Sequence, residues 1–494
     1  MQKAKQKRKQ RSGVEKSRTL DRKPLSTFTL GLGLSLFLNA AASAQDQRDE
    51  EIFGSPTPPQ PESSPQPPSV SQSSPQNEGR TQGLGDTLQV GGRLEVRGAT
   101  GQLEQQPFPE ASYSQLKTAD IYFDTRPNKD LRVFLRTRLE ERDATVTTPG
   151  TAGGPPSSQR VNSLTTAIDE LWFKWDLEDR LFFTYGKQHL KWGSGRLWNP
   201  TDFTAREVRD PFALFDRRLG QELLKIHFPQ EKEGHNYYAV FQFDDASRND
   251  DISLALRGEF SVGSSAELAI SAQTGRARPQ RIGLDLSSAL GPFDVNVEAA
   301  GSKRNQRDFF TGGIDVETRQ LPGVEKREDR WLGQALGGIR QSYQYSEEDN
   351  FTWGVEYLWN ELGYEEADLE LYSLALGQSQ PLYAGRRYVG AFFLLPNPGS
   401  WNETSFYLNA IQNLSDRSAT LRLTATWELV DAATIEAYVS RCFGDTGELC
   451  LKLPPAYKEL AELPGVSPEV KSAVALLPTR QTRVTAGTAV TIVF

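Results

Sequence analysis

Stretches in which apolar and polar residues alternate recur along most of the chain, from Leu88 to the last residue. Between Leu131 and Leu139 the chain reads Leu-Arg-Val-Phe-Leu-Arg-Thr-Arg-Leu, with mostly aliphatic residues at one set of alternate positions and the arginines at the other. Because successive side chains of a β-strand point to opposite faces, such a stretch forms a strand with one apolar and one polar face. Similar alternation occurs in segments 252–260, 266–273, 293–299, 351–357 and 419–427. The pattern predicts an all-β protein built from amphipathic strands.

Strand length separates two folds that share this pattern. A soluble β-sandwich also has one apolar and one polar face per strand, but its strands most often have about 5–6 residues. A tilted strand that crosses a bilayer needs about 9–11 residues, with its apolar face toward lipid and its polar face toward a water-filled interior. Segments 131–139, 252–260 and 419–427 suit the longer crossing. Strand length therefore favours a transmembrane barrel.

The alternating pattern predicts about 18 strands. They begin near residues 88, 119, 131, 167, 180, 221, 236, 252, 265, 281, 293, 335, 350, 387, 404, 418, 434 and 482. Those near 281, 387 and 404 are the weakest, so 16 strands are the alternative. The long connections span 98–118, 142–165, 189–219, 302–334, 361–386 and 444–480, and short turns alternate with them. Short periplasmic turns and longer external loops are typical of bacterial barrels, so residues 87–494 are predicted to form an antiparallel up-and-down β-barrel with both termini periplasmic.

Aromatic residues gather near the predicted strand ends, as the aromatic girdles of a membrane barrel require. They are Trp172, Trp175, Phe182, Phe183, Tyr237, Tyr238, Trp353, Trp359, Tyr388, Trp401 and Trp427. A soluble core also uses aromatic residues, so these clusters support the barrel without deciding for it.

The last predicted strand runs from Arg483 to Phe494 and ends the chain on an aromatic residue. This strand resembles the closing strand of bacterial outer-membrane barrels, in which the final phenylalanine belongs to the signal for the barrel assembly machinery. A terminal strand docked in an ordinary sandwich is the alternative. In a closed barrel this strand is expected to pair with Leu88–Arg97, because closure hides both edge strands.

The N-terminus has the features of a secretory signal peptide, predicted over residues 1–44. Basic residues precede an apolar run, Phe28–Leu38, and Ala42-Ser43-Ala44 provides a small-residue cleavage site. A helix needs about 20 residues to span a bilayer, and the apolar run is shorter than that. Residues 45–86, rich in Pro, Ser and Gln, are predicted to be a disordered periplasmic linker that cannot bury a core. The sequence therefore predicts export to the outer membrane of a Gram-negative-type bacterium.

Charge and cysteine content narrow the function further. The formal net charge is −8, and removal of residues 1–44, which carry ten basic and two acidic residues, takes it to −16. An exported acidic chain is a poor nucleic-acid binder, so no nucleic-acid partner is expected. Cys442 and Cys450 are disulfide candidates in an oxidising periplasm, and a metal pair is the weaker alternative because no histidine is near. No metal site and no cofactor are expected.

The third long connection contains a recognisable motif. The chain runs Gly-Lys-Gln over residues 186–188, Trp-Gly-Ser-Gly over 192–195 and Asn-Pro-Thr-Asp over 199–202. This order resembles porin-like outer-membrane proteins, in which a strand ending in Gly-x-Gln leads into Trp-Gly-x-Gly and Asn-Pro-Thr-Asp. The close resemblance is confined to this segment, and the rest of the chain matches by architecture alone. It implies a channel-like barrel without identifying a solute.

The same connection has the properties of a loop that folds into a barrel. Gly193 and Gly195 permit unusual backbone conformations, Pro200 stiffens the path, and Asn199 can cap a local turn. Trp192 is the further loop-shaping candidate. The third loop of general porins narrows the lumen, and this loop has the same ordinal position. We therefore expect a pore constriction here, with an external loop as the alternative. Its charged candidates are Lys191, Arg196, Asp202, Arg206 and Arg209.

A strand rich in arginine is the second candidate feature. Arg132, Arg136 and Arg138 lie on the face that alternation turns inward. Inward acidic residues are predicted as well: Glu95, Asp124, Glu140, Glu170, Glu259, Asp294, Glu298, Glu356 and Glu428. Charged rings set ion selectivity, whereas cross-strand ion pairs are the alternative role for such residues. The arginine excess, and a resemblance to alginate-export-type barrels with arginine-rich lumens, point to anionic solutes.

Catalysis has little support in the sequence. His189 and Ser194 flank a glycine-rich turn without an obvious carboxylate to orient the histidine, and no phosphate loop or Gly-x-Ser-x-Gly motif is present. The predicted function is an outer-membrane porin-like channel for passive diffusion of small hydrophilic, anionic solutes, and not an enzyme. The alternative is a non-conducting barrel for surface attachment or polysaccharide export. Outer-membrane lipid is the expected surrounding, and both a monomer and a homo-oligomer are compatible with the sequence.

Overall fold

The structure is a computed structural model that describes most of the chain after the linker. The described residues are 88–103, 108, 111–148, 157–178, 180–205, 207, 218–230, 232–244, 246–263, 265–276, 278–315, 318, 320–347, 349–452, 471 and 482–494. The predicted signal peptide and the predicted linker lie outside these residues.

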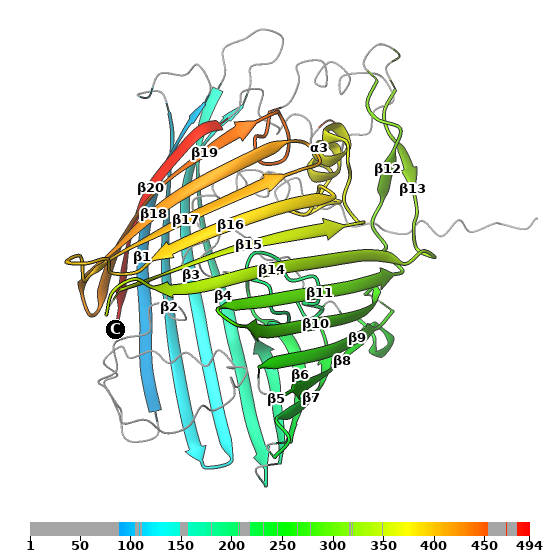
Figure 1. The fold of residues 1–494 in the computed structure, drawn as a ribbon, viewed down its shortest axis with the longest axis vertical. Coiled ribbons are helices and arrows are strands. Elements are labelled where there is room, and N and C mark those ends of the chain that lie inside the picture. The colour runs from blue at the N-terminus through cyan, green and yellow to red at the C-terminus, as the bar shows by residue number, and fades with distance from the viewer. Residues whose placement is uncertain are drawn as a thin grey trace, which may run out of the picture.

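The described residues form one sheet of 18 strands, in which every pairing is antiparallel. Each strand pairs with the next strand of the sheet along the chain, and β20 also pairs with β1. The strands are β1 (Leu88–Leu103), β2 (Ser112–Asn128), β3 (Leu131–Thr148), β4 (Ser157–Leu177), β5 (Leu181–Gln188), β6 (Gln221–Gln230), β7 (His235–Gln242), β8 (Ser253–Val262), β9 (Ala266–Thr274), β10 (Gln280–Leu290), β11 (Phe293–Lys303), β14 (Leu332–Gln344), β15 (Asn350–Asn360), β16 (Arg387–Leu395), β17 (Thr404–Asn413), β18 (Ser418–Val430), β19 (Ala433–Gly444) and β20 (Thr482–Val493). Figure 1 shows how strongly the strands tilt. The predicted up-and-down barrel of 18 strands is confirmed.

The first and last strands close the barrel. β20 pairs with β1 from Arg93 opposite Val493 to Leu103 opposite Thr482. Beyond the strand, the backbone of Phe494 exchanges two hydrogen bonds with Gly92, at 3.0 Å and 2.8 Å. The predicted pairing of the two ends is confirmed, although it extends over Arg93–Leu103 rather than Leu88–Arg97. Closure leaves the sheet without an edge strand.

The two faces of the barrel wall have opposite chemistry. In β1, Leu94 and Val96 point outward and are 44% and 47% exposed, whereas Glu95 and Arg97 point inward and are 1% and 2% exposed. The same inversion recurs in other strands, with exposed Leu, Ile, Val and Phe on the outside. An apolar outer belt and a polar interior suit a barrel that spans a membrane, where every backbone group must be paired. Among the described residues, no helix is long and apolar enough to cross a bilayer.

The strands from β1 to β4 are longer than their sequence pattern predicts. β2 begins at Ser112 rather than near residue 119, and β4 begins at Ser157 rather than near residue 167. The predicted loops 98–118 and 142–165 are therefore too long. The β3–β4 ladder continues to Thr148 opposite Ser157, through polar sequence that does not alternate. Backbone pairing continues there without an amphipathic pattern, because the part of a strand that extends beyond the apolar belt has no side that faces lipid.

The longer connections carry small elements of their own. The β11–β14 connection contains the hairpin β12 (Phe309–Thr311) and β13 (Gly323–Glu325), and the β15–β16 connection contains α3 (Ala367–Ala375). A 3₁₀ turn, η3 (Asn249–Asp251), precedes β8. Figure 1 shows α3 and the β12–β13 hairpin at the end of the barrel away from the C-terminus. One end of the barrel is thus covered by long connections.

The predicted disulfide is wrong. Cys442 and Cys450 are both thiols. The Cys442 thiol donates to the Thr482 carbonyl of β20 at 3.4 Å, whereas the Cys450 thiol contacts the Ala419 carbonyl of β18 at 3.5 Å. The Cys450 thiol also donates to the Phe443 carbonyl, beside Cys442, at 3.1 Å, so the two thiols bind different carbonyl groups and are not bonded to each other.

The aromatic girdle prediction is only partly confirmed. Trp175 and Trp401 are 51% and 54% exposed on the outside, as a girdle requires. Trp172 and Tyr238, by contrast, occupy inward positions of β4 and β7, in register with Phe134 and Arg257. Such inward aromatic residues line the lumen wall, so they do not belong to a girdle at the membrane interface.

Removal of Phe494 is expected to impair barrel assembly. Its backbone bonds fix the end of the seam, and its ring lies so close to Gly92 that a Cβ there would come within 2.7 Å. Deletion of Phe494 should lower the yield of closed barrel severalfold, measured as the fraction that migrates faster on electrophoresis before heating. Phe494→Tyr keeps the backbone and the ring and is the matched control. Equal yields of the deletion variant and wild type would contradict this role.

Candidate functional site: a loop folded into the lumen

The described part of the β5–β6 connection, residues 189–205, 207 and 218–220, lies inside the barrel and follows its inner wall. The Gln242 side chain of β7 donates to the Thr204 carbonyl at 3.1 Å, and that of Gln273 in β9 donates to the Phe203 carbonyl at 2.9 Å. Both glutamines are buried inward residues. The loop then reaches β11 and β15, on strands far from its own. The inward position expected for this connection is therefore the one observed.

Glu298 of β11 binds the loop through a single carboxylate. Its Oε1 accepts hydrogen bonds from the backbone N–H groups of Ser194 and Gly195, at 2.8 Å and 2.7 Å. Its Oε2 accepts from the N–H and the hydroxyl of Thr201, at 3.0 Å and 2.7 Å. Glu298 is fully buried, so these four donors replace the water that the carboxylate gives up.

Glu356 of β15 binds the next residues of the loop in the same way. It accepts from the backbone N–H of Arg196 at 2.6 Å and from that of Leu197 at 2.8 Å. The Arg196 guanidinium lies over the rings of Phe392 in β16 and Tyr407 in β17, at 4.3 Å and 5.5 Å from the ring centroids. The tip of the loop is thus attached to three successive strands, β15, β16 and β17, in addition to β11.

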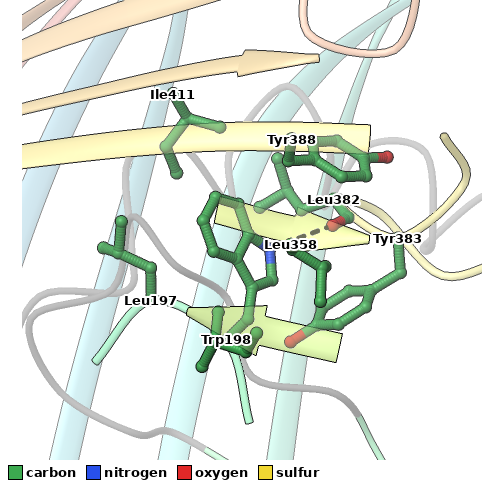
Figure 2. Packing of buried hydrophobic residues seen from close by; sticks show 8 residues of the cluster. Leu197, Trp198, Leu358, Leu382, Tyr383, Tyr388 and Ile411 are labelled. Carbon is green, nitrogen blue, oxygen red and sulfur yellow. Dashed lines mark hydrogen bonds between the residues drawn. The ribbon is translucent and has the colours of Figure 1, made fainter. Parts of the chain in front are cut away.

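An apolar cluster completes the attachment. Trp198 is fully buried and donates its indole N–H to the Leu382 carbonyl at 3.2 Å, as Figure 2 shows. Its ring packs against Tyr388 of β16 with centroids 5.8 Å apart. The cluster consists of Leu197, Trp198, Leu336, Leu358, Leu382, Tyr383, Tyr388 and Ile411. Apolar inward residues on β14–β17 thus mark the wall that the loop covers.

Asp169 of β4 holds the two ends of the loop. It accepts from the His189 ring at 3.1 Å and from the Gly220 backbone N–H at 3.3 Å, and its other oxygen accepts from Arg138 at 2.9 Å. The register of β3 and β4 shifts at this point, because Arg136 opposes Glu170 and Thr137 opposes Ile168. A β-bulge therefore turns Asp169 inward beside Glu170. Strict alternation assigns Asp169 to the outer face, so sequence analysis missed it.

Backbone shape at the loop tip depends on its glycines. Gly193 has φ +91°, a conformation that side chains disfavour, and a Cβ there would come within 2.9 Å of the Glu298 carboxylate. On the wall, Gly390 of β16 leaves room for Leu197 and Trp198, because a Cβ would stand 3.0 Å from the indole. Both glycines permit close contact between loop and wall.

The remaining loop residues predicted from sequence have different surroundings. Lys191 is exposed, and Trp192 is buried against Phe203 and β6. Asn199 and Pro200 are buried. The Asp202 carboxylate accepts from Thr204 at 3.0 Å and from Arg218 at 3.4 Å, which fixes a local turn. Arg206 and Arg209 lie outside the described residues.

The arginines of β3 are paired with acidic residues of the neighbouring strands. Arg132 forms two hydrogen bonds with Asp124 of β2, at 2.9 Å and 2.6 Å. Arg136 lies 3.5 Å from Glu170. Arg138 pairs with Asp120 at 2.9 Å, in addition to Asp169. This geometry matches the cross-strand ion pairs that were the alternative to a selectivity ring.

Catalytic groups do not come together in the part of the chain that the structure describes. His189 has a carboxylate partner in Asp169, which sequence analysis did not find. The Ser194 hydroxyl, however, is buried without a hydrogen-bond partner, so it receives no activation from that histidine. No group of described His, Cys, Asp or Glu side chains has the arrangement to hold a metal ion.

A second cluster of carboxyl groups joins the long connections at the covered end. Glu448 accepts from the backbone N–H groups of Leu382 and Ala384 and from the Asn413 side chain. Asn413 also donates to Glu370 of α3 at 2.7 Å. Burial raises the pKa of Glu448 to about 7. Burial and the neighbouring carboxylates raise the pKa of Glu370 as well. The protonated forms of Glu448 and Glu370 therefore stabilise the packing of these connections.

The closed barrel, its apolar outer belt and its inward loop together define a porin-like architecture. No protein-family model and no curated protein sequence matches the chain. Among solved structures, OccAB1 of Acinetobacter baumannii is 8% identical and aligns over 84% of this chain and 98% of its own, with a TM-score of 0.46. OccK11 of Pseudomonas aeruginosa is 8% identical over 82% and 96%, with a TM-score of 0.46. A triple mutant of the Rhodopseudomonas blastica porin is 9% identical over 82% and 100%, with a TM-score of 0.38. At these values the likeness carries no argument about function.

Loss of the Glu298 carboxylate is expected to release the loop tip. Each hydrogen bond to a charged group contributes about 1.5–3 kcal/mol, and Glu298 accepts four. Glu298→Ala should speed trypsin cleavage after Arg196 at least about tenfold, which corresponds to about 1.4 kcal/mol. Glu298→Gln should do so as well, because its amide presents a donor to backbone donors.

Asp294→Asn is the matched control for the loop experiment. Asp294 lies on the same strand and pairs with Arg340, but both side chains are about half exposed and neither binds the loop. Cleavage of this variant should match wild type. If Glu298→Ala is cleaved at the same rate as wild type, the Glu298 carboxylate does not hold the loop.

The packing around Glu448 is expected to weaken as the pH rises. A carboxyl group whose pKa is raised by folding stabilises the folded form most below its ordinary pKa of 4.5, and this stability is lost as the pH rises to about 7. The backbone amides of Leu382 and Ala384 should lose at least about tenfold in hydrogen-exchange protection factor between pH 5 and pH 8, since one pKa unit corresponds to a factor of ten. Glu448→Gln should flatten this dependence. Equal protection factors for wild type at both pH values would contradict it.

Proposed function

We propose that the protein is an outer-membrane channel through which small hydrophilic solutes diffuse passively, with the 189–220 loop as its constriction. The observation that carries the proposal is the position of this loop, which leaves β5, follows the inner wall and binds Glu298 and Glu356 on the far strands. A loop fixed along the wall of a polar lumen narrows the path for solutes without closing the lumen. Lys191, Arg196 and Asp202 supply charge at this level, and Arg206 and Arg209 belong to the same loop by sequence.

Arg196 favours anionic solutes. Its Nε and Nη2 atoms are buried without a hydrogen-bond partner, and its guanidinium contacts the aromatic rings of Phe392 and Tyr407. Among the described residues no carboxylate forms an ion pair with it. The arginines of β3, by contrast, are neutralised by Asp120, Asp124 and Glu170. A cation that keeps its charge at a narrow point attracts anions.

The proposed setting is the outer membrane of a Gram-negative-type bacterium, with both termini periplasmic. The apolar belt supports lipid as the surrounding medium, and the end of β20 lies beside the short β18–β19 turn, where Val493 donates to the Ala432 carbonyl at 2.9 Å. Residues 1–44 would direct export, and the strand ending at Phe494 would be recognised by the barrel assembly machinery.

A non-conducting barrel for surface attachment or polysaccharide export is the second candidate. The observation that favours it is the interlocked cover at one end, where Arg307 donates to the Gln378 carbonyl at 3.1 Å and to Ser379 at 3.3 Å. The ring of Phe310 packs edge-on against Tyr372 of α3. Conductance in planar bilayers separates the two candidates, because a barrel closed by this cover passes no ion current.

Deletion of residues 193–210 is expected to raise single-channel conductance severalfold, because it removes the material that fills the lumen. Heat-dependent electrophoretic mobility checks that the variant still forms a barrel. A folded deletion variant with the conductance of wild type would rule out the constriction role.

Wild type is also expected to show an anion-selective reversal potential in a salt gradient, and Arg196→Gln a smaller one, because one uncompensated charge is lost. Lys117→Gln is the control, since this exposed lysine pairs with Glu141 away from the loop. Cation selectivity of wild type would end the anionic assignment.

A further inference from the structure

We propose that Lys174, Thr184 and Lys225 form a binding station for a multiply charged oxyanion of the phosphate class on the inner wall. The inference rests on the proposed channel function and names a solute that such a channel would pass. The station lies on β4, β5 and β6, the strands from which the inward loop departs and to which it returns.

The register of the sheet places the three residues in one row. Lys174 is directly opposite Thr184 in the β4–β5 pair, and Thr184 is directly opposite Lys225 in the β5–β6 pair. Neighbouring positions in an antiparallel pair are about 4.5–5.5 Å apart, so the two lysine backbones are about 10 Å apart. All three positions face inward, and Thr184 and Lys225 are buried. The long lysine side chains can therefore approach one ligand from both sides of a hydroxyl group.

Neither lysine is neutralised by an ion pair among the described residues. Lys225 is only 7% exposed, and the charged group that acts on it is Lys174, a second cation. Lys174 lies over the Phe182 ring, 4.7 Å from its centroid, and Asp176 is the acidic residue in its vicinity. A buried cation beside another cation is costly unless an anion compensates it.

The other inward cations nearby differ from these lysines. Arg132, next to Lys174 in the same row, forms two hydrogen bonds with Asp124. Arg257, one strand beyond β7, pairs with Glu259 at 2.8 Å and with Asp285 at 2.7 Å. The wall thus supplies a carboxylate for these arginines and leaves the two lysines for a ligand. Selective omission of acidic partners is what an anion site requires.

The residue types point to phosphate-class oxyanions. An ammonium group is a compact point charge that binds phosphate without the planar geometry that arginine imposes. Two ammonium groups balance a dianion, and the threonine hydroxyl between them can donate one further hydrogen bond. On the neighbouring row, Phe182, His227 and Tyr238 lie side by side in register, with the His227 and Tyr238 rings stacked at 4.5 Å. This aromatic row bounds the station on the side of the short turns.

Calorimetric titration of the purified full-length protein in detergent with inorganic phosphate tests the station directly. Wild type should bind phosphate saturably. Lys225→Gln and Lys174→Gln should each weaken binding at least about tenfold, which corresponds to about 1.4 kcal/mol. Lys225→Arg keeps the charge and should retain most of the affinity. Arg340→Gln, which removes an inward cation already paired with Asp294, should bind as wild type does.

Several outcomes would overturn the station. These are no saturable phosphate binding by wild type, unchanged affinity of a folded Lys225→Gln variant, or acetate binding as tightly as phosphate. Heat-dependent mobility shows whether each variant is folded. Titration with glycerol phosphate distinguishes the two sources of the ligand. If glycerol phosphate binds more tightly than inorganic phosphate, the ligand is a phosphate ester, and if it binds more weakly, the ligand is the free ion.

The same variants in planar bilayers separate this inference from the proposed function. If wild type conducts, phosphate should reduce its current, and Lys225→Gln should need at least about tenfold more phosphate for the same reduction. A barrel that conducts without any effect of phosphate or of Lys225→Gln overturns the station and leaves the channel intact. A barrel that binds phosphate through Lys225 but never conducts supports the station and overturns the channel.

Discussion

The need of backbone N–H groups for acceptors in a water-poor interior governs the inside of this barrel. A loop that leaves the sheet and enters the lumen has no ladder of its own, so its donors must find other partners. Glu298 and Glu356 meet this need at the loop tip, and Asp169 meets it for Gly220 where the loop returns to the wall. The carboxylates in turn are buried only because those donors replace water. Loop and wall therefore stabilise each other.

This arrangement also sets the charge of the lumen. Carboxylates that bind backbone donors are satisfied without consuming a basic side chain, while the carboxylates near β3 pair with its arginines. Within the part of the chain that the structure describes, the cations without an ion pair include Arg196 on the loop and Lys174 and Lys225 on the wall. The distribution of charge in the lumen thus depends on which acidic groups bind backbone donors and which pair with a cation. It does not depend only on the number of charges of each sign.

Much of the fold could be predicted from the sequence, because lipid on one side and water on the other impose strict alternation on each crossing. All the strands predicted from that alternation are present, and Glu298 and Glu356 were correctly placed inside. Their partners could not be predicted, since a carboxylate that binds backbone amides has no complementary residue type in the sequence. Asp169 was missed because a bulge breaks the period of two, and Cys442 and Cys450 were misjudged because spacing does not reveal which strand a side chain faces.

The seam between β1 and β20 has a consequence for biogenesis. The two strands that close the sheet are the first and the last of its strands in chain order, so the closing contacts have the greatest sequence separation in the barrel. Until β1 and β20 pair, each of them presents an unpaired edge. Closure therefore requires β20, and a chain truncated within it would leave an open sheet that is prone to associate with other chains.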